Sequence, residues 1–335
     1  MSVRPLDKDG QFSGEKFRPK DGTDGSVNGL NGRVRTLYFE GDFGELFPNL
    51  DPADTHRLDW GFAIGRQPVF VQEGILINDN IDAIGIVRNS IRISGASNTR
   101  VTALVGWNNV NRNNNVRDDN AALYGVFTET DWPFSTVDID LAYVDASRSN
   151  SSGYFIGLSG VQRFGHVDTS LRYLYSNADK ADTPTISTGS LVFFEISGSP
   201  VTTHNTVYFN GFWGVNNFSS AARDVDTGGP LGRTGILFAA VGLGTFAPAL
   251  NNRAGDVVGG SLGYQMYFAH GRQQLILELG SRNETTGAKT ASSAAGARYQ
   301  LAMGRHSIFV LDGYVGDHDI NGSNNGARVE LRVKF

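Results

Sequence analysis

The chain has 335 residues, including 42 glycines, with 11% aromatic and 19% charged residues; this composition favours β structure with many turns, as two domains or one large β unit. The formal charge of −5, without a basic block, excludes electrostatic capture of nucleic acid as the main function. The absence of cysteine excludes disulfides, thiol nucleophiles and zinc–thiolate sites.

The first 32 residues contain no apolar segment of the kind that a secretory signal peptide requires. We therefore expect residues 1–32 to be a disordered lead-in and residues 33–335 to form a single domain. No run of 18 apolar residues occurs in the chain, which excludes a transmembrane helix. Membrane-spanning strands stay possible, because such strands need only alternate between apolar and polar residues.

From residue 33 onward the chain consists of about fifteen tracts of roughly ten to fourteen residues with period-two alternation. Clusters of Gly, Asn, Asp and Ser separate the tracts, and helical periodicity is absent. In Ser135–Asp145, for example, Val137, Ile139 and Leu141 alternate with threonine and aspartate. Each strand is therefore predicted to have one apolar and one polar face.

Three observations favour a transmembrane β-barrel over a soluble β protein. The tracts match the length of about 9–11 residues that a tilted strand needs to cross a bilayer. Short connections such as DWPFS and RFGH alternate with long polar ones such as VNRNNNVRDDN and ASRSNSSG. Aromatic residues gather near tract ends, as at Trp107, Trp132 and Phe164, where they would form interfacial girdles.

The number of strands has to be even in a bacterial single-chain barrel, so a count of fifteen tracts leaves one strand unidentified. The two candidate locations are the N-terminus and residues 218–253, where residues 235–243 could form another strand. We expect residues 218–253 to be a long loop, with folding into the lumen as one option, and the first strand to be the uncertain one. Sixteen antiparallel strands are expected, with fourteen as the second choice.

Two short pieces of the sequence carry a family resemblance. The C-terminal ARVELRVKF alternates strictly and ends on Phe335, which resembles the terminal signature of Gram-negative outer-membrane porins. Residues 61–86 are similar to the strand, loop and strand around a GRQ sequence in alginate-export and related substrate-specific porins. Gly65, Arg66 and Gln67 match that sequence, and Asp82 lies where the next strand begins, but the rest of the pattern is absent. The resemblance implies recognition of the last strand by the barrel-assembly machinery.

Charges on the inner face of a porin form an electrostatic filter for solutes. Arg88 and Arg92 are expected on one strand and Arg100 on its neighbour, with Asp138 and Asp140 supplying the opposite sign. The remaining residues that we expect to line the pore are Arg172, Glu278, Arg298, Arg328 and Glu330. The lumen is thus predicted to be mixed in sign, and for each residue a wall salt bridge without a role in selection is an equal alternative.

Metal binding and catalysis have weaker support in the sequence. Asp317, Asp319 and Asn321 fit the first half of an EF-hand calcium loop, but its last ligand position is Arg328. Residues 78–82 form a second oxygen-rich cluster. Of six histidines, only His318 is expected at the outer rim, and no nucleophile motif accompanies it. We expect neither a cofactor nor enzymatic activity.

The sequence therefore predicts a passive channel for small hydrophilic or charged solutes in the outer membrane of a Gram-negative bacterium. The expected partners are the bilayer with its lipopolysaccharide, the solutes and the barrel-assembly machinery, with a homotrimer as one option. A surface-binding or adhesion barrel is the alternative, and a soluble β-rich protein is the third interpretation. The identity of the solute does not follow from alternation, which determines only the facing of side chains.

Overall fold

The structure is a computed structural model that describes residues 2–3, 7–8, 11–16, 25–50, 52, 57–147, 151–240, 247–320 and 322–333. Asn321, the terminal Phe335, parts of the lead-in 1–32 and residues 241–243 lie outside the described residues. Within the described ranges, no helix is long and apolar enough to cross a membrane.

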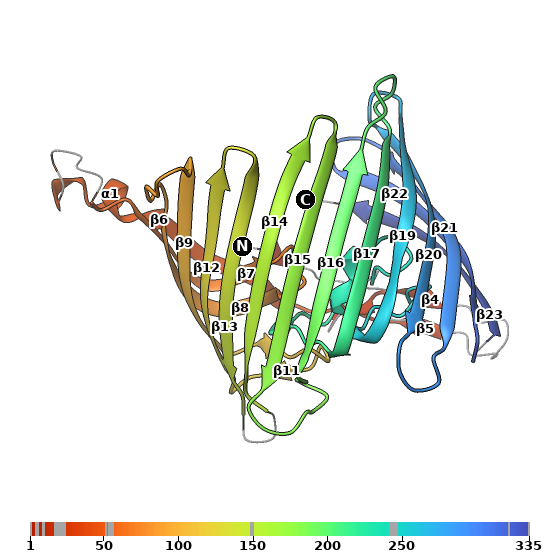
Figure 1. The fold of residues 1–335 in the computed structure, drawn as a ribbon, viewed down its shortest axis with the longest axis horizontal. Helices are drawn as coiled ribbons and strands as arrows, with labels where there is room; N and C mark the ends of the chain where they lie inside the picture. The colour runs from red at the N-terminus through yellow and green to blue at the C-terminus, as the bar shows by residue number, and fades with distance from the viewer. Residues whose placement is uncertain are drawn as a thin grey trace.

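Fifteen long strands within the described ranges make up the wall, each pairing with the next along the chain (Figure 1). They are β6 (Val34–Asp42), β7 (Trp60–Val71), β8 (Ile77–Arg88), β9 (Asn98–Trp107), β12 (Ala122–Trp132), β13 (Ser135–Asp145), β14 (Gly153–Phe164), β15 (Val167–Ala178), β16 (Gly189–Gly198), β17 (Thr206–Asn217), β19 (Gly255–Phe268), β20 (Gln273–Glu284), β21 (Ala291–Ala302), β22 (Ser307–His318) and β23 (Gly322–Val333). Each is long enough to cross a bilayer when tilted, or nearly so.

Two dipeptide strands complete this 17-stranded sheet. Strand β1 (Ser2–Val3) pairs antiparallel with β6, whereas β18 (Ala222–Arg223) runs parallel to β8. Without β18, the sheet has sixteen antiparallel strands, which confirms the expected number. The additional strand comes from the N-terminus, and the described part of residues 235–243 forms a turn instead of a strand.

The remaining elements of the described ranges are short. They are β2 (Asp7–Lys8), β3 (Gln11–Phe12), β4 (Gly14–Lys16), β5 (Gly25–Val27), β10 (Val110–Asn111), β11 (Arg117–Asp118), α1 (Phe43–Leu46), η1 (Pro48–Leu50) and η2 (Pro230–Arg233). Strands β2 and β3 pair with each other, as do β4 and β5. The disordered lead-in over residues 1–32 stays a prediction.

The two faces of the wall differ as the alternation predicts. Ile139 and Leu141 on β13 are about half exposed, while Asp140 between them is 4% exposed. Leu277 and Leu279 on β20 are likewise exposed and flank the buried Glu278. A wall that exposes leucine and isoleucine outward and buries carboxylates inward is the reverse of a soluble barrel.

The hairpin of β7 and β8 leaves the wall before it turns. Strand β6 pairs with residues 61–66 of β7, and β9 pairs with residues 82–88 of β8. Residues 67–71 and 77–81, between these limits and the turn, pair with each other. Gly65 has a φ of +122°, and a Cβ there would clash with the carbonyl oxygen of Leu37, so the departure point needs glycine. We call residues 67–81 the hairpin tip.

The hairpin tip packs with residues 108–121 and with the described part of residues 218–253, namely 218–240 and 247–253, into one group, which we call the inner cluster. Ile75, Leu76 and Ile77 of the tip have no exposed surface, and neither does Phe238. Backbone bonds join the segments, since the Ala221 amide donates to the Leu76 carbonyl at 2.9 Å. Among the described residues, many of the buried apolar side chains belong to the inner cluster. The large apolar side chains on the outer face of the wall are exposed instead.

Candidate pore lining

The inward charges of the wall are arranged by strand register. Arg100 on β9, Glu129 on β12 and Asp138 on β13 are direct cross-strand neighbours. The row continues through Ser159 on β14 to Arg172 on β15. Arg100 Nη2 lies 2.9 Å from Glu129 Oε2, and Ser159 Oγ donates to Asp138 Oδ2 at 2.6 Å. Five consecutive strands therefore carry one row of four charged side chains and one serine hydroxyl.

A second row lies on the last three strands. Asp312 on β22 is the register partner of both Arg298 on β21 and Arg328 on β23. The Nε atoms of these arginines lie 2.7 and 2.9 Å from the Asp312 carboxylate. Glu330 accepts from Arg328 Nη1 at 2.9 Å and from Arg332 Nε at 2.7 Å. One carboxylate thus holds two guanidinium groups side by side.

A third set of ion pairs connects the wall to the inner cluster. Glu195 on β16 contacts Arg172 and also accepts from Arg233 Nε at 2.9 Å. Arg233, in η2, lies 3.1 Å from Glu73 in the turn of the hairpin tip. Three ion pairs therefore run in series from Arg172 through Glu195 and Arg233 to Glu73. They connect residues 218–253 and the hairpin tip to strands β15 and β16.

Glu278 also holds the inner cluster. Its carboxylate accepts from the backbone amides of Ile236 and Leu237 at 3.0 and 2.9 Å and from the hydroxyl of Tyr208. The side chain is 2% exposed. A carboxylate with three donors is a fixed anchor for the segment.

The positions of Arg88 and Arg92 correct the sequence prediction. Arg88 has the same parity as the exposed Ile84 and Ile86, at the end of β8, and its guanidinium lies 5.3 Å from the ring centre of Trp60. Arg92 is exposed in the connection that follows β8. The prediction assumed a longer strand of constant facing, but β8 ends at Arg88.

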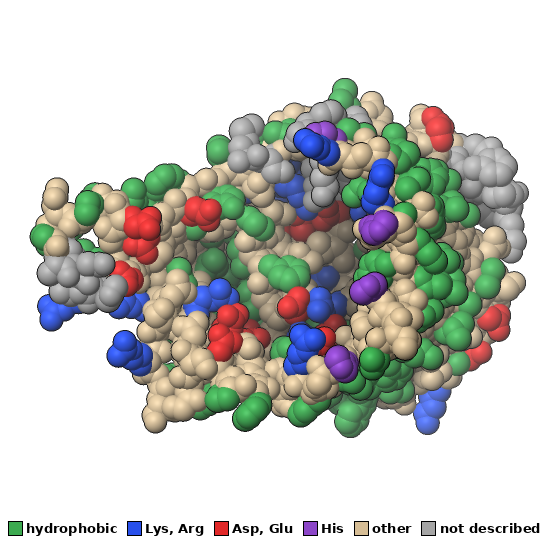
Figure 2. Space-filling view, turned by 90° about the horizontal axis from the view of Figure 1, so that it is seen from above, with side chains coloured by type: hydrophobic (Ala, Val, Ile, Leu, Met, Phe, Trp, Pro, Cys, Tyr) green, Lys and Arg blue, Asp and Glu red, His purple; other side chains and the backbone are tan. Residues whose placement is uncertain are grey.

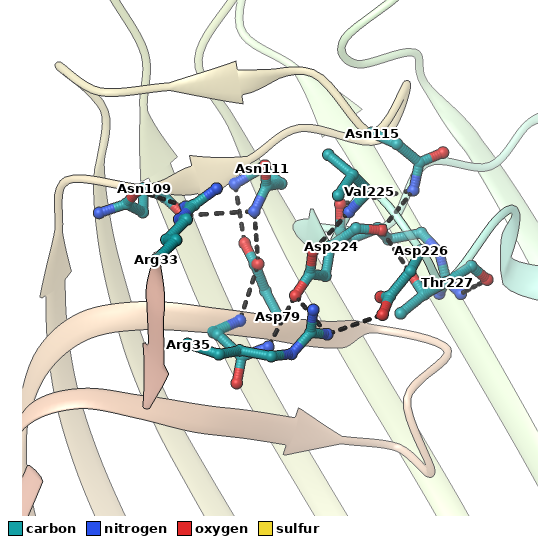
Figure 3. A network of polar contacts seen from close by, with 12 residues as sticks. Arg33, Arg35, Asp79, Asn109, Asn111, Asn115, Asp224, Val225, Asp226 and Thr227 are labelled. Carbon is teal, nitrogen blue, oxygen red and sulfur yellow. Dashed lines mark hydrogen bonds and ion pairs between the residues drawn. The ribbon is translucent and has the colours of Figure 1, made fainter. Parts of the chain in front are cut away.

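A polar network joins the three segments of the inner cluster (Figure 3). Asp79 of the hairpin tip accepts from the backbone and side-chain amides of Asn111 at 2.7 and 2.6 Å. Asn80 donates to Asp224 at 2.6 Å, and Arg35 lies 2.9 Å from both Asp224 and Asp226. The two aspartates come from residues 218–253, so the network couples that segment to the tip and to the start of β6.

Burial changes the ionisation of this network. Burial, together with the nearby Asp226, raises the pKa of Asp224 above its ordinary value, although Arg35 acts in the opposite direction. Arg253 lies in the same segment, and burial lowers the pKa of its guanidinium. Formation of the network therefore removes charged groups from water, which costs desolvation free energy.

The calcium candidates have other hydrogen-bond partners in the structure. Asp319 accepts from the Ala291 amide at 2.7 Å, and in the second cluster Asp82 binds Arg66 at 2.8 and 2.9 Å. The described part of the chain contains no group of three Asp, Glu, His or Cys side chains that could hold a metal ion. Calcium binding stays a prediction.

A histidine and a serine meet at the end of the wall where β21 begins and β22 ends. His318 Nδ1 lies 2.8 Å from Ser292 Oγ. Nε2 has no partner among the described residues. A hydrolytic group would need an acid to orient the imidazole, and no such contact is present in the described ranges.

Two cavities lie against the inner face. One, of about 710 Å³, lies between the hairpin tip and strands β9, β12 and β13. The other, of about 300 Å³, is lined by Tyr208, Arg233 and Arg298 among others. Figure 2 shows the molecule from the end with short connections, where acidic and basic side chains gather in a hollow and apolar ones cover the flank.

The pairing register between neighbouring strands determines which inward charges contact each other. This register cannot be read from the sequence alone, so the ion pairs were not predicted.

Comparison with known proteins adds evidence on the fold. No protein-family model and no curated protein matches the chain. Among solved structures, it is similar to OccK1 (OpdK) of Pseudomonas aeruginosa, with a TM-score of 0.58, 11% identity, and coverage of 82% of this chain and 75% of that one. A BenF-like porin from Pseudomonas fluorescens Pf-5 gives a TM-score of 0.56 at 11% identity, covering 82% and 74%.

OccAB2 of Acinetobacter baumannii is a third similar structure, with a TM-score of 0.54, 11% identity, and coverage of 82% of this chain and 73% of that one. At such low identity the likeness establishes the fold. The predicted resemblance to substrate-specific porins is confirmed at this level: the chain has the antiparallel β-barrel fold of these proteins.

Proposed function

We propose that this chain is an outer-membrane porin of a Gram-negative bacterium and conducts small hydrophilic or charged solutes by passive diffusion. Similar structures are described as an outer membrane protein and as a BenF-like porin, which supports the location and the role. The observation that carries the proposal is the inverted wall, with exposed leucines outside and a charged row from Arg100 to Arg172 inside.

The pore lining in this proposal consists of inward charges of the wall. These are Arg100, Asp138, Asp140, Arg172, Glu278, Arg298, Arg328 and Glu330. Residues 218–253 and the hairpin tip narrow the path, because they bind to inward side chains such as Glu278 and Glu195. Solutes pass the two cavities on either side of this inner cluster.

Several further expectations belong to the same proposal. The last strand is recognised by the barrel-assembly machinery, the outer flank contacts lipid and lipopolysaccharide, and a homotrimer is one possible assembly. The chain acts without a cofactor and without catalysis. The Ser292 and His318 contact is then a cross-strand hydrogen bond of the wall, since these residues are register partners.

Uptake into proteoliposomes tests the channel function directly. Vesicles of bacterial lipid that contain the purified protein should swell when placed in an isotonic solution of a small neutral sugar such as arabinose, and should swell more slowly with a larger sugar. The adhesion alternative predicts no swelling above that of empty vesicles. A swelling rate equal to that of empty vesicles would therefore refute the channel.

A further inference from the structure

The larger cavity has an unusual charge for a lumen of mixed sign. It lies between the hairpin tip and strands β9, β12 and β13, and we call it the chamber. Its lining contains five carboxylates and one guanidinium, namely Glu40, Glu73, Glu129, Asp138, Asp140 and Arg100. The chamber is therefore acidic overall, in contrast to the smaller cavity, whose charged lining residues are two arginines.

Ion pairing leaves three of these carboxylates uncompensated. Arg100 pairs with Glu129 at 2.9 Å, and Glu73 pairs with Arg233 at 3.1 Å. Glu40, Asp138 and Asp140 form no ion pair with another described residue. Carboxylates that share a cavity with low-dielectric walls attract cations.

The hairpin tip adds an acceptor to the same place. Gln72 lines the chamber and is 5% exposed, and its Nε2 donates to Asp140 Oδ2 at 2.7 Å. Its Oε1 is buried without a donor from the described residues, and so is Oδ1 of Asp138. Buried acceptors are normally paired, so the site lacks hydrogen-bond donors. The terminal torsion of glutamine is soft, so the amide oxygen can turn toward a donor in the chamber.

Apolar side chains also line the chamber, beside the polar Gln67, Thr102 and Thr128. Leu104 and Phe127 come from the wall, and Val69 and Val71 come from the hairpin tip. A solute that fits these walls carries an alkyl stem beside its charge, because apolar surface favours burial of methylene groups. The volume of about 710 Å³ accommodates a molecule of several heavy atoms.

We infer that the chamber binds a compact organic cation, an alkylguanidinium or alkylammonium ion, whose N–H groups donate to Asp138, Asp140 and Gln72. The inference deepens the proposed channel function by naming the class of solute that the chamber selects. A guanidinium supplies several donors in one plane together with its charge, which matches a site that is short of both donors and cations.

Isothermal titration calorimetry on the detergent-solubilised barrel tests this site without requiring conduction. n-Butylguanidinium chloride is the probe, with sodium butyrate and n-butanol as ligands of similar size but different charge. The first variant is Asp138→Asn with Asp140→Asn, and the second is Gln72→Met, which keeps the length of the side chain. Asp168→Asn is the matched control, because Asp168 is an exposed carboxylate outside the chamber.

The wild-type barrel and the control should bind butylguanidinium and neither of the other ligands. The double variant should lose about tenfold or more in affinity, and Gln72→Met should lose several-fold, as expected for hydrogen bonds to a charged group. Equal affinity in all variants, or equal binding of butyrate, would overturn the site. Vesicle swelling is measured on the same samples. A wild-type barrel that supports swelling but does not bind butylguanidinium rejects the site alone, and a wild-type barrel that binds butylguanidinium but supports no swelling rejects the channel alone.

Discussion

At the level of residues, period-two alternation predicts the facing of most wall charges but not their partners. Three charged side chains are buried while apolar residues next to them in the sequence are exposed on the other face, as the alternation predicts: Arg172, Glu278 and Arg328. The pairing of Arg328 with Asp312 depends on register between strands, which one sequence does not encode in a readable form. Arg92 was misplaced because alternation gives no sign of where a strand ends, whereas Arg88 shares the parity of the exposed Ile84 and Ile86, so the alternation itself places it on the apolar face.

The carboxylate of Asp312 provides a stability test at this scale. Its side chain is 8% exposed and lies between the guanidinium groups of Arg298 and Arg328, of which the latter is 3% exposed. Asp312→Asn removes the carboxylate that Arg298 and Arg328 share and leaves the buried Arg328 with Glu330 as its remaining counter-ion, so we expect it to reduce the free energy of unfolding by about 3–5 kcal/mol. Urea titration followed by the heat-modifiable gel shift of the barrel measures the change.

Glu330→Gln is the control for Asp312→Asn. Glu330 is more exposed and pairs with Arg328 and Arg332 at the edge of the same group. Removal of a more solvated partner should cost no more than about 1 kcal/mol. If both variants unfold at the urea concentration of the wild type, the Asp312 group does not stabilise the wall.

At the level of elements, the hairpin of β7 and β8 shows what alternation misses. Its strands read as wall strands in the sequence, yet residues 67–81 leave the wall and form part of the inner cluster. Two local signs were available: the glycine at position 65, and the apolar run Ile75, Leu76, Ile77, which does not alternate. Tertiary packing against residues 218–253 decides the outcome, and that packing is non-local.

Docking of residues 218–253 should depend on pH through Asp224. Burial raises the pKa of Asp224 in the docked state, so the docked state binds this proton more tightly than the released state does. Protonation of Asp224 therefore stabilises the docked state. This stabilisation is fully present below the pKa of a free aspartate and is lost as pH rises through the raised pKa. Acidification from neutral pH should therefore strengthen docking and reduce conductance.

Asp224→Asn isolates this effect, because asparagine resembles the protonated carboxyl. The variant should keep the low conductance at all pH values between about 4 and 7, whereas the control Asp168→Asn should respond as the wild type does. Channel current at a series of pH values gives the comparison. An unchanged pH response in Asp224→Asn would show that another group controls docking.

At the level of the whole molecule, the sequence predicts the class, the number of strands and the direction of their faces. Fifteen alternating tracts and a parity rule led to sixteen strands, and the N-terminal dipeptide β1 supplies the sixteenth. Two residues carry no periodicity, so this strand could not be identified in advance. The inner cluster could not be predicted from the sequence, because its contacts join segments more than a hundred residues apart, such as Asn115 and Asp224.

The lipid-facing assignment makes its own prediction. Leu141 lies near the middle of β13 and is 51% exposed on the outer face. Leu141→Arg should reduce the free energy of folding into a bilayer by about 2–4 kcal/mol, because it places a charge in hydrocarbon. Thr102→Arg, which enters the acidic chamber, should cost much less. Urea titration in lipid vesicles compares the two, and equal costs would contradict the assignment of faces.

The central claim is that the barrel encloses a conducting path, and single-channel recording in a planar bilayer tests it most directly. Purified protein added to one side of the bilayer in potassium chloride should produce discrete current steps of uniform size. Under a salt gradient, the reversal potential should shift toward anion preference in the Asp138→Asn, Asp140→Asn variant, because two inward negative charges are removed. A bilayer that stays silent after verified insertion of folded barrels would contradict the account.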